Sequence, residues 1–223
     1  MSKQLVMLGM HRSGTSLLFG VCKELGIFIG NRLLGKSRSN PLGHFEDKEF
    51  VDLNEAILRS LKSSWDRPPK GNYSINENFK SKMEKLIKSR DSSYEIWGWK
   101  DPRTCLFINT YKQYLTNPYY IICNRNPKDI AKSLLKRNGF SMERSLKLTS
   151  TYTESIKNFV SSIEESRCLF IDYNKFIENP DTTIQSIIYF LVINPNQEQI
   201  TNSKNLVCSR EKIKKLSDNF KKS

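Results

Sequence analysis

The sequence lacks long hydrophobic runs, is poor in histidine and has no closely spaced cysteines. No stretch of about 18 apolar residues occurs, which argues against a membrane-spanning helix. The first apolar run is short and ends at His11 and Arg12, unlike a secretion signal, so we expect a cytoplasmic protein. With 2 histidines and 5 scattered cysteines, no familiar zinc-ligand spacing is present, and we expect no metal and reduced, buried thiols.

Acidic residues are fewer than basic ones. The chain has 36 Lys and Arg against 23 Asp and Glu, a formal net charge of +13 at pH 7. Such a surplus favours anionic partners, which include nucleic acid, acidic membranes and phosphorylated or sulfated compounds, without choosing among them. Part of the charge lies in a basic C-terminal segment, residues 196–223, which is more typical of a solvated helix end than of a binding site.

The length of 223 residues and a hydrophobic content of 38% suit one compact domain, residues 1–223. Strand-like and helix-like patterns alternate along it. Because strands separated by helices form parallel sheets, we predict an α/β fold, namely a single P-loop-type three-layer domain with a central, mostly parallel sheet flanked by helices. We expect strands at residues 5–8, 94–99, 119–123 and 167–171, helices at 16–25, 47–61, 76–89 and 181–191, and a surface loop at 27–45.

The segment G-M-H-R-S-G-T-S, residues 9–16, joins the first strand to the first helix. Its glycines have the spacing of a phosphate-binding loop, in which successive N–H groups and a helix N-terminus face one anion. Thr15 stands where a lysine is usual in such loops, and Arg12 offers the anion a permanent charge instead. The residues that we expect to bind the anion are Gly9, His11, Arg12, Ser13, Gly14, Thr15 and Ser16.

A second anion site is predicted at the end of another strand. Arg125 follows the strand at 119–123, and a helix that begins near Pro127 carries Ser133 about two turns further on. Ligands of parallel sheets bind beyond the carboxyl ends of the strands. Arg125 and Ser133 can therefore converge on one phosphate.

Three segments in this order resemble one known family, the sulfotransferases that use 3'-phosphoadenosine 5'-phosphosulfate (PAPS), in particular small bacterial-type members. They are the loop at 9–16, W-G-W-K-D-P-R at 97–103 and the R-x-P-x(5)-S pattern that ends at Ser133. The resemblance runs from residue 5 to residue 191. Its later part, I-D-Y-N-K-F-I-E-N-P, is similar to the family's V-x-Y-E-D-L-x-x-D-P, but Asn174 and Lys175 replace the acidic pair and weaken any assignment for Tyr173.

The resemblance implies an enzyme that moves a sulfuryl group from PAPS to a hydroxyl or amine by in-line transfer and releases adenosine 3',5'-bisphosphate, without a metal. The first loop then cradles the 5'-phosphosulfate, and Arg125 and Ser133 bind the 3'-phosphate that distinguishes PAPS from ATP. In-line transfer needs a base for the acceptor's proton and positive charge near the leaving phosphate. Glu46 is the predicted base, His44 is the alternative, and Lys100 is the predicted catalytic cation.

Other assignments stay open in the sequence. Asp47 is better suited to capping the following helix than to catalysis. Either at least one of Lys100 and Arg103 touches the phosphosulfate or the acceptor, or the two residues form ion pairs with Asp101. His11 either donates a hydrogen bond to the sulfuryl group or packs locally.

Two competing functions follow from the same residues. A small-molecule kinase with a degenerate P-loop would need the lysine and Mg²⁺ of ATP-binding loops, and it would leave the second anion site without a purpose. A nucleic-acid or polyanion-binding protein would use interleaved aromatic and basic residues to stack on bases and contact phosphates. Packing of strands and helices explains the presence of such residues in this chain more simply, so we expect no nucleic-acid partner. These residues are Tyr111, Lys112, Tyr114, Tyr119 and Tyr120.

The acceptor is not determined by the sequence. Acceptor pockets in this architecture are built from loops, here expected at residues 27–45, 65–75 and 138–145. Trp65 belongs either to such a pocket or to the core. Small molecules, glycans and lipids are all compatible with the sequence, and so is any oligomeric state.

Overall fold

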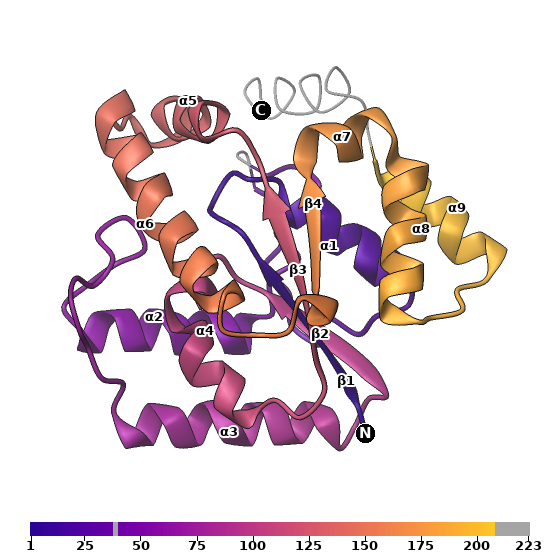
Figure 1. The fold of residues 1–223 in the computed structure, drawn as a ribbon, viewed down its shortest axis with the longest axis horizontal. Coiled ribbons are helices and arrows are strands. Elements are labelled where there is room, and N and C mark those ends of the chain that lie inside the picture. The colour runs from indigo at the N-terminus through magenta and orange to yellow at the C-terminus, as the bar shows by residue number, and fades with distance from the viewer. Residues whose placement is uncertain (38–39, 208–223) are drawn as a thin grey trace.

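A computed structural model describes residues 1–37 and 40–207 of the protein (Figure 1). Within these residues, the centre of the fold is a sheet of four parallel strands in the order β2-β1-β3-β4. The carboxyl ends of the strands meet at one edge, where Leu8 pairs with Ile122 and Asn124 with Asp172. The strands are β1 Lys3–Leu8, β2 Ile96–Lys100, β3 Pro118–Asn124 and β4 Cys168–Asp172, all close to the predicted positions.

Helices cover both faces of the sheet. Alternate side chains of a strand enter opposite faces, so in β1 Val6 and Leu8 join one hydrophobic core, whereas Leu5 and Met7 join the other. The predicted single α/β domain with its three layers is therefore confirmed. The first core is covered by α2 Lys48–Ser60, α3 Glu77–Asp91, α4 Thr104–Tyr111, α5 Pro127–Asn138 and α6 Met142–Val160, and the second by α1 Thr15–Glu24, α7 Tyr173–Glu178, α8 Pro180–Leu191 and α9 Gln197–Leu206 (Figure 1).

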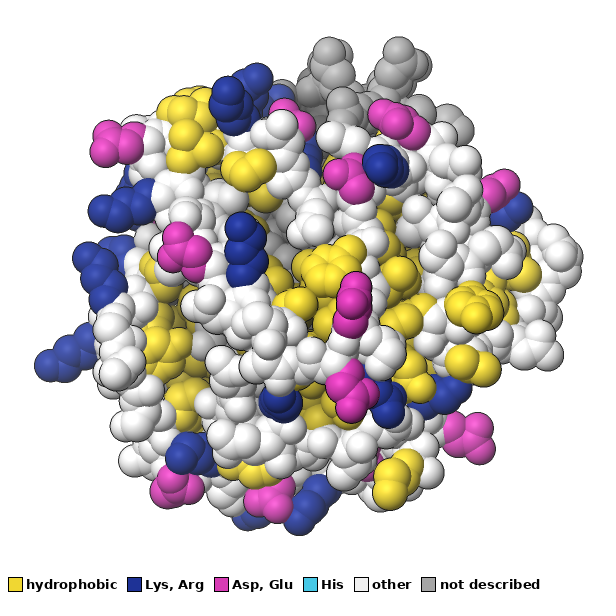
Figure 2. All heavy atoms as spheres, viewed as in Figure 1, with side chains coloured by type: hydrophobic (Ala, Val, Ile, Leu, Met, Phe, Trp, Pro, Cys, Tyr) yellow, Lys and Arg dark blue, Asp and Glu magenta, His cyan; other side chains and the backbone are white. Residues whose placement is uncertain are grey.

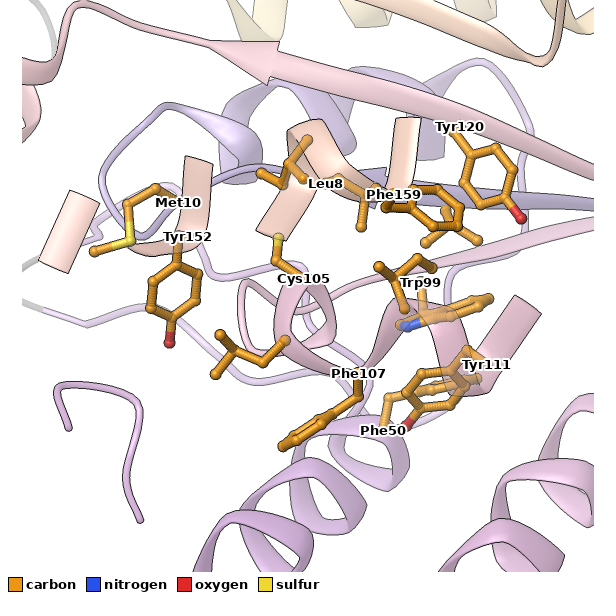
Figure 3. Close-up of a cluster of buried hydrophobic side chains, with 14 of the residues drawn as sticks. Leu8, Met10, Phe50, Trp99, Cys105, Phe107, Tyr111, Tyr120, Tyr152 and Phe159 are labelled. Atoms are coloured by element: carbon orange, nitrogen blue, oxygen red, sulfur yellow. The ribbon is translucent and has the colours of Figure 1, made fainter. Parts of the chain in front are cut away.

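Aromatic side chains form much of the first core (Figure 3). The rings of Phe50 and Trp99 stack with their centroids 4.5 Å apart, and the Trp99 indole donates a hydrogen bond to Thr104 Oγ1 at 3.0 Å. Tyr111 and Tyr120 are buried in this core as well. Their rings cannot stack on bases, as a nucleic-acid-binding role for this aromatic segment would require.

The four cysteines in the described part of the chain, Cys22, Cys105, Cys123 and Cys168, are free thiols. Burial raises the pKa of Cys22, Cys105 and Cys123 to about 12, so these side chains are neutral at pH 7 and pack as small apolar groups. Cys208 lies outside the described residues.

Three α-helices, α6, α7 and α9, were not predicted. The prediction of a loop at 138–145 is wrong, because only a short turn separates the end of α5 from the start of α6. Polar Ser145 and Thr149 occupy buried positions of α6 and hide its hydrophobic period. α9 begins with a capping box between Asn196 and Gln199 and packs against α1, so the first part of the basic segment is folded. The rest of that segment, residues 208–223, lies outside the described residues.

The surface loop expected at 27–45 begins later than predicted. Ile27 and Ile29 are buried in the second core. Between them, Phe28 forms a parallel bridge with Trp97 of β2, and its carbonyl accepts a hydrogen bond from Gly98 N at 2.9 Å. This part of the chain therefore covers the outer edge of β2.

Asp47 caps α2, as the sequence predicted. Its Oδ1 atom accepts a hydrogen bond from Glu49 N at 3.0 Å. Its Oδ2 atom accepts one at 2.9 Å from the buried guanidinium of Arg90, which lies in α3 and also contacts the Glu49 carboxylate. The cap thus ties α2 to α3 beside the sheet.

We expect Asp47→Ala to lower the free energy of unfolding by about 3 kcal/mol, because it removes the cap and one of the two carboxylates that pair with buried Arg90. Urea denaturation measures the loss. Asp47→Asn keeps a capping oxygen and should lose less. Asp52→Ala, at an exposed position of the same helix, should change the value by about 0.5 kcal/mol or less. Equal stability of Asp47→Ala and Asp52→Ala would contradict the prediction.

Candidate active site

The loop at 9–16 lies at the carboxyl end of β1 and leads directly into α1. Gly14 is the N-cap of α1 with φ of 104°, and Arg12 also has positive φ, at 71°. A Cβ atom on Gly9 would lie 2.6 Å from Thr15 Cγ2, and one on Gly14 would lie 2.0 Å from Tyr173 Cδ2. The loop therefore requires glycine at both positions, and its left-handed turn followed by a helix N-terminus is the kind of backbone in which N–H groups can bind an anion.

Three buried side-chain nitrogen or oxygen atoms at this loop have no hydrogen-bond partner among the described residues. They are His11 Nε2, Ser13 Oγ and Arg125 Nε. Buried polar atoms are almost always hydrogen-bonded, so unpartnered atoms in the loop and in Arg125, which contacts the loop, are what a site for a polar ligand would leave. An imidazole, a hydroxyl and a guanidinium are groups that bind phosphate and sulfate oxygens.

The two anion sites predicted from the sequence lie side by side. Arg12 Nε donates a hydrogen bond to Ser133 Oγ at 2.9 Å, and the Arg12 carbonyl accepts one from Arg125 Nη1, also at 2.9 Å. Arg125 lies 4.8 Å above the ring of Tyr173, which orients it. Burial, together with the positive charges of Arg137 and Arg125, lowers the pKa of Arg12 to about 10, and Arg12 therefore remains charged at neutral pH.

Lys100 brings an ammonium group to the loop that lacks its own lysine. It ends β2, is 1% exposed, and its Nζ donates hydrogen bonds to Ser16 Oγ at 3.0 Å and to Glu46 Oε1 at 2.7 Å. The ion pair with Asp101 that the sequence allowed for Lys100 is wrong. Arg103 makes that pair instead, with Nη1 at 2.7 Å from Asp101 Oδ1, and a second one with Glu55.

Glu46 and His44 lie in the segment that precedes α2. Glu46 is buried against Lys100, whereas His44 is half-buried with Nε2 at 3.0 Å from Ser37 Oγ. Burial lowers the pKa of His44, which is therefore neutral at pH 7 despite the nearby negative charge of Glu46. Of these two candidate bases, Glu46 is the one that pairs with Lys100, the cation that reaches the loop.

The sequence matches the family described as "Sulfotransferase family" over residues 4–196. The chain belongs to this sulfotransferase family. A solved sulfotransferase from Mycobacterium avium is 12% identical, with a TM-score of 0.60 over 92% of this chain and 67% of that chain. The sulfotransferase domain of a Synechococcus olefin synthase is 14% identical, with a TM-score of 0.59 over 99% and 87% of the two chains. At these identities the solved structures show a shared fold. No curated protein matches the sequence.

Family and fold together indicate a transferase. In this sulfotransferase, aromatic side chains pack around His11 of the loop. His11 packs with its ring centroid 4.6 Å from that of Trp65 and 5.8 Å from that of Tyr152. Burial, followed by the positive charges of Arg103 and Arg137, lowers the pKa of His11 well below its ordinary value. His11 thus packs locally, as one of the two alternatives in the sequence has it, and its Nε2 has no hydrogen-bond partner among the described residues. A hydrogen bond from His11 to the sulfuryl group stays a prediction.

Sequence reasoning missed three residues around this loop, Arg137, Phe140 and Tyr152. The Arg137 guanidinium lies 5.2 Å above the Trp65 ring, and Trp65 stacks with Phe140 at 6.0 Å. Trp65 therefore touches both the core and the site. A helical pattern could have found Arg137, because it follows Ser133 by four residues on α5 and shares its face.

Two further properties concern the described residues as a whole. They contain no group of three or more His, Cys, Asp or Glu side chains that could hold a metal ion. None of their helices combines the length and the apolar composition that crossing a bilayer demands.

Proposed function

We propose that this sulfotransferase transfers a sulfuryl group from PAPS to a hydroxyl or amine acceptor. The observation that carries the proposal is the set of unpartnered buried atoms at the loop, His11 Nε2, Ser13 Oγ and Arg125 Nε. All three can donate hydrogen bonds to the oxygens of an anion in a single bound molecule. The cytoplasm, where PAPS would be available, remains the expected location.

The residues of the two anion sites fit a donor with two phosphate groups. Backbone N–H groups of the loop, with Ser13, Thr15 and Ser16, would hold the 5'-phosphosulfate at the N-terminus of α1. Arg125 and Ser133 would hold the 3'-phosphate. The Ser133 hydroxyl accepts its hydrogen bond from Arg12, which leaves the hydroxyl proton for a phosphate oxygen.

Lys100 and Glu46 would supply the chemistry. The acceptor oxygen or nitrogen forms a bond to sulfur while the bond between sulfur and the bridging phosphate oxygen breaks, and the acceptor's proton passes to a base. Glu46 is the proposed base, with His44 as the alternative. Lys100, which is shared between Ser16 and Glu46, can move toward the charge that develops on the leaving phosphate and release the Glu46 carboxylate to accept the proton.

Calorimetry with adenosine 3',5'-bisphosphate tests the donor site. We expect selective micromolar binding, with ATP and Mg²⁺ binding much more weakly. Arg125→Ala should weaken bisphosphate binding by about 100-fold, because charge-assisted hydrogen bonds contribute about 1.5–3 kcal/mol each.

Arg167→Ala is the matched control, because Arg167 also lies over a tyrosine ring, 5.0 Å above Tyr119. Arg167 directly precedes β4, so it lies at the amino end of that strand, whereas the proposed site lies at the carboxyl ends of the strands. This variant should bind the bisphosphate as the wild type does. Tighter binding of ATP with Mg²⁺, or equal losses in the two arginine variants, would contradict the PAPS assignment and favour a kinase-like or a general polyanion site.

A further inference from the structure

Helix α5 carries a cation, Arg137, about one turn beyond Ser133. Ser133 and Arg137 are four residues apart in α5 and therefore lie on one face of the helix, about 6 Å apart along its axis. Because Ser133 accepts a hydrogen bond from Arg12, that face lies against the loop. The Arg137 guanidinium stacks over Trp65, whose ring contacts His11. Arg137 thus borders the site where the sulfuryl group would be transferred.

Unlike Lys100 and Arg103, Arg137 makes no ion pair among the described residues. Lys100 is paired with Glu46, and Arg103 is paired with Asp101 and Glu55. The Arg137 Nε atom donates to Asn138 Oδ1 at 2.6 Å, and neither terminal nitrogen makes a hydrogen bond within the described part of the chain. A half-buried guanidinium with unused donors is a binding group for a carboxylate or phosphate.

The position of Arg137 assigns it to the acceptor rather than to the donor. The two charged ends of PAPS have their own groups, in the loop and at Arg125. Arg137 lies further along α5 and contacts Trp65, which stacks with Phe140 from the turn between α5 and α6. Trp65 belongs to a segment, residues 65–75, in which the sequence predicted an acceptor pocket. Arg144, which lies over Phe140, is already paired with Asp66.

We propose that Arg137 binds an anionic group of the acceptor, so that this sulfotransferase modifies hydroxyl or amine compounds that carry a carboxylate or a phosphate. The inference rests on the proposed function. Lys and Arg side chains are spread over the face of the molecule that Figure 2 shows, including the surface around α5 and α6. Two exposed lysines of α5, Lys128 and Lys132, would attract anionic compounds toward the site.

Equilibrium binding to the protein saturated with adenosine 3',5'-bisphosphate tests the inference. The probes are phenyl phosphate, benzoate and neutral benzyl alcohol, titrated by calorimetry into the wild type, Arg137→Gln and Lys136→Gln. We expect at least one anion to bind the wild-type complex more tightly than benzyl alcohol. Arg137→Gln should weaken that anion at least tenfold and leave both benzyl alcohol and the bisphosphate unchanged, whereas Lys136→Gln, which removes an exposed charge from the next position, should change nothing.

The relative affinities of phenyl phosphate and benzoate distinguish a phosphate-bearing from a carboxylate-bearing acceptor. Equal binding of anions and benzyl alcohol, or anion binding that survives Arg137→Gln, would overturn the inference. Weaker bisphosphate binding in Arg137→Gln would also overturn it, by assigning the residue to the donor. Failure of the wild type to bind the bisphosphate is seen in the first titration, before any acceptor probe is added, and it would refute the proposed function and the inference together.

Discussion

Replacing Gly14 by alanine is expected to abolish detectable binding of adenosine 3',5'-bisphosphate. Gly14 has φ of 104°, a conformation that alanine rarely adopts. The new methyl group would lie 2.0 Å from Tyr173 Cδ2, so the tyrosine ring would have to move. Tyr173 lies under the guanidinium of Arg125. One substitution therefore disturbs both the loop that faces the 5'-phosphosulfate and the arginine proposed for the 3'-phosphate.

Gly71→Ala is the matched control for this prediction. Gly71 also has positive φ, at 67°, but among the described residues no atom beyond its chain neighbours lies within 4 Å of the position that its Cβ would take. Both variants bear a backbone strain of about 1–3 kcal/mol, whereas only Gly14→Ala adds the clash. We expect Gly71→Ala to bind the bisphosphate like the wild type in calorimetry, with both proteins folded by circular dichroism. Unchanged binding by Gly14→Ala would show that the loop does not hold the donor.

Glu46→Gln is expected to lower the rate of sulfuryl transfer by at least about 100-fold while bisphosphate binding stays within a few fold, since a general base contributes about 10²–10⁴ to the rate. The amide cannot take the acceptor's proton. The variant should also lose about 3 kcal/mol of unfolding free energy, because it leaves the Lys100 ammonium, 1% exposed, without its carboxylate. Transfer of radiolabelled sulfur from PAPS to a mixture of candidate acceptors measures the rate, and urea denaturation measures the stability.

The double variant Glu46→Gln with Lys100→Met separates stability from catalysis. Removing both charges should restore most of the lost stability, because no unpaired ion stays buried, but it should not restore transfer. His44→Gln is the control for the base. If His44→Gln abolishes transfer and Glu46→Gln does not, the proton passes to His44, and Glu46 serves to hold Lys100 in place.

Much of the fold could be predicted from local patterns. The alternation of apolar strands and amphipathic helices predicted the parallel α/β sheet, because the period of hydrophobic residues depends on neighbours in the chain. The cap at Asp47 was predictable for the same reason, since a capping side chain bonds to a backbone group two residues away. Helix α6 was not predicted, because Ser145 and Thr149 occupy its buried face, where an amphipathic helix usually has apolar residues.

The sequence by itself determined the glycine loop, the strand ends and the family, since each depends on residues that are close along the chain. Only the tertiary structure decided which side chains meet. Lys100 and Glu46 are 54 residues apart and Arg12 and Ser133 are 121 apart, and nothing in the spacing of either pair indicates a contact. Parallel strands bring such residues together, because their carboxyl ends align at one edge of the sheet whatever length of chain separates them.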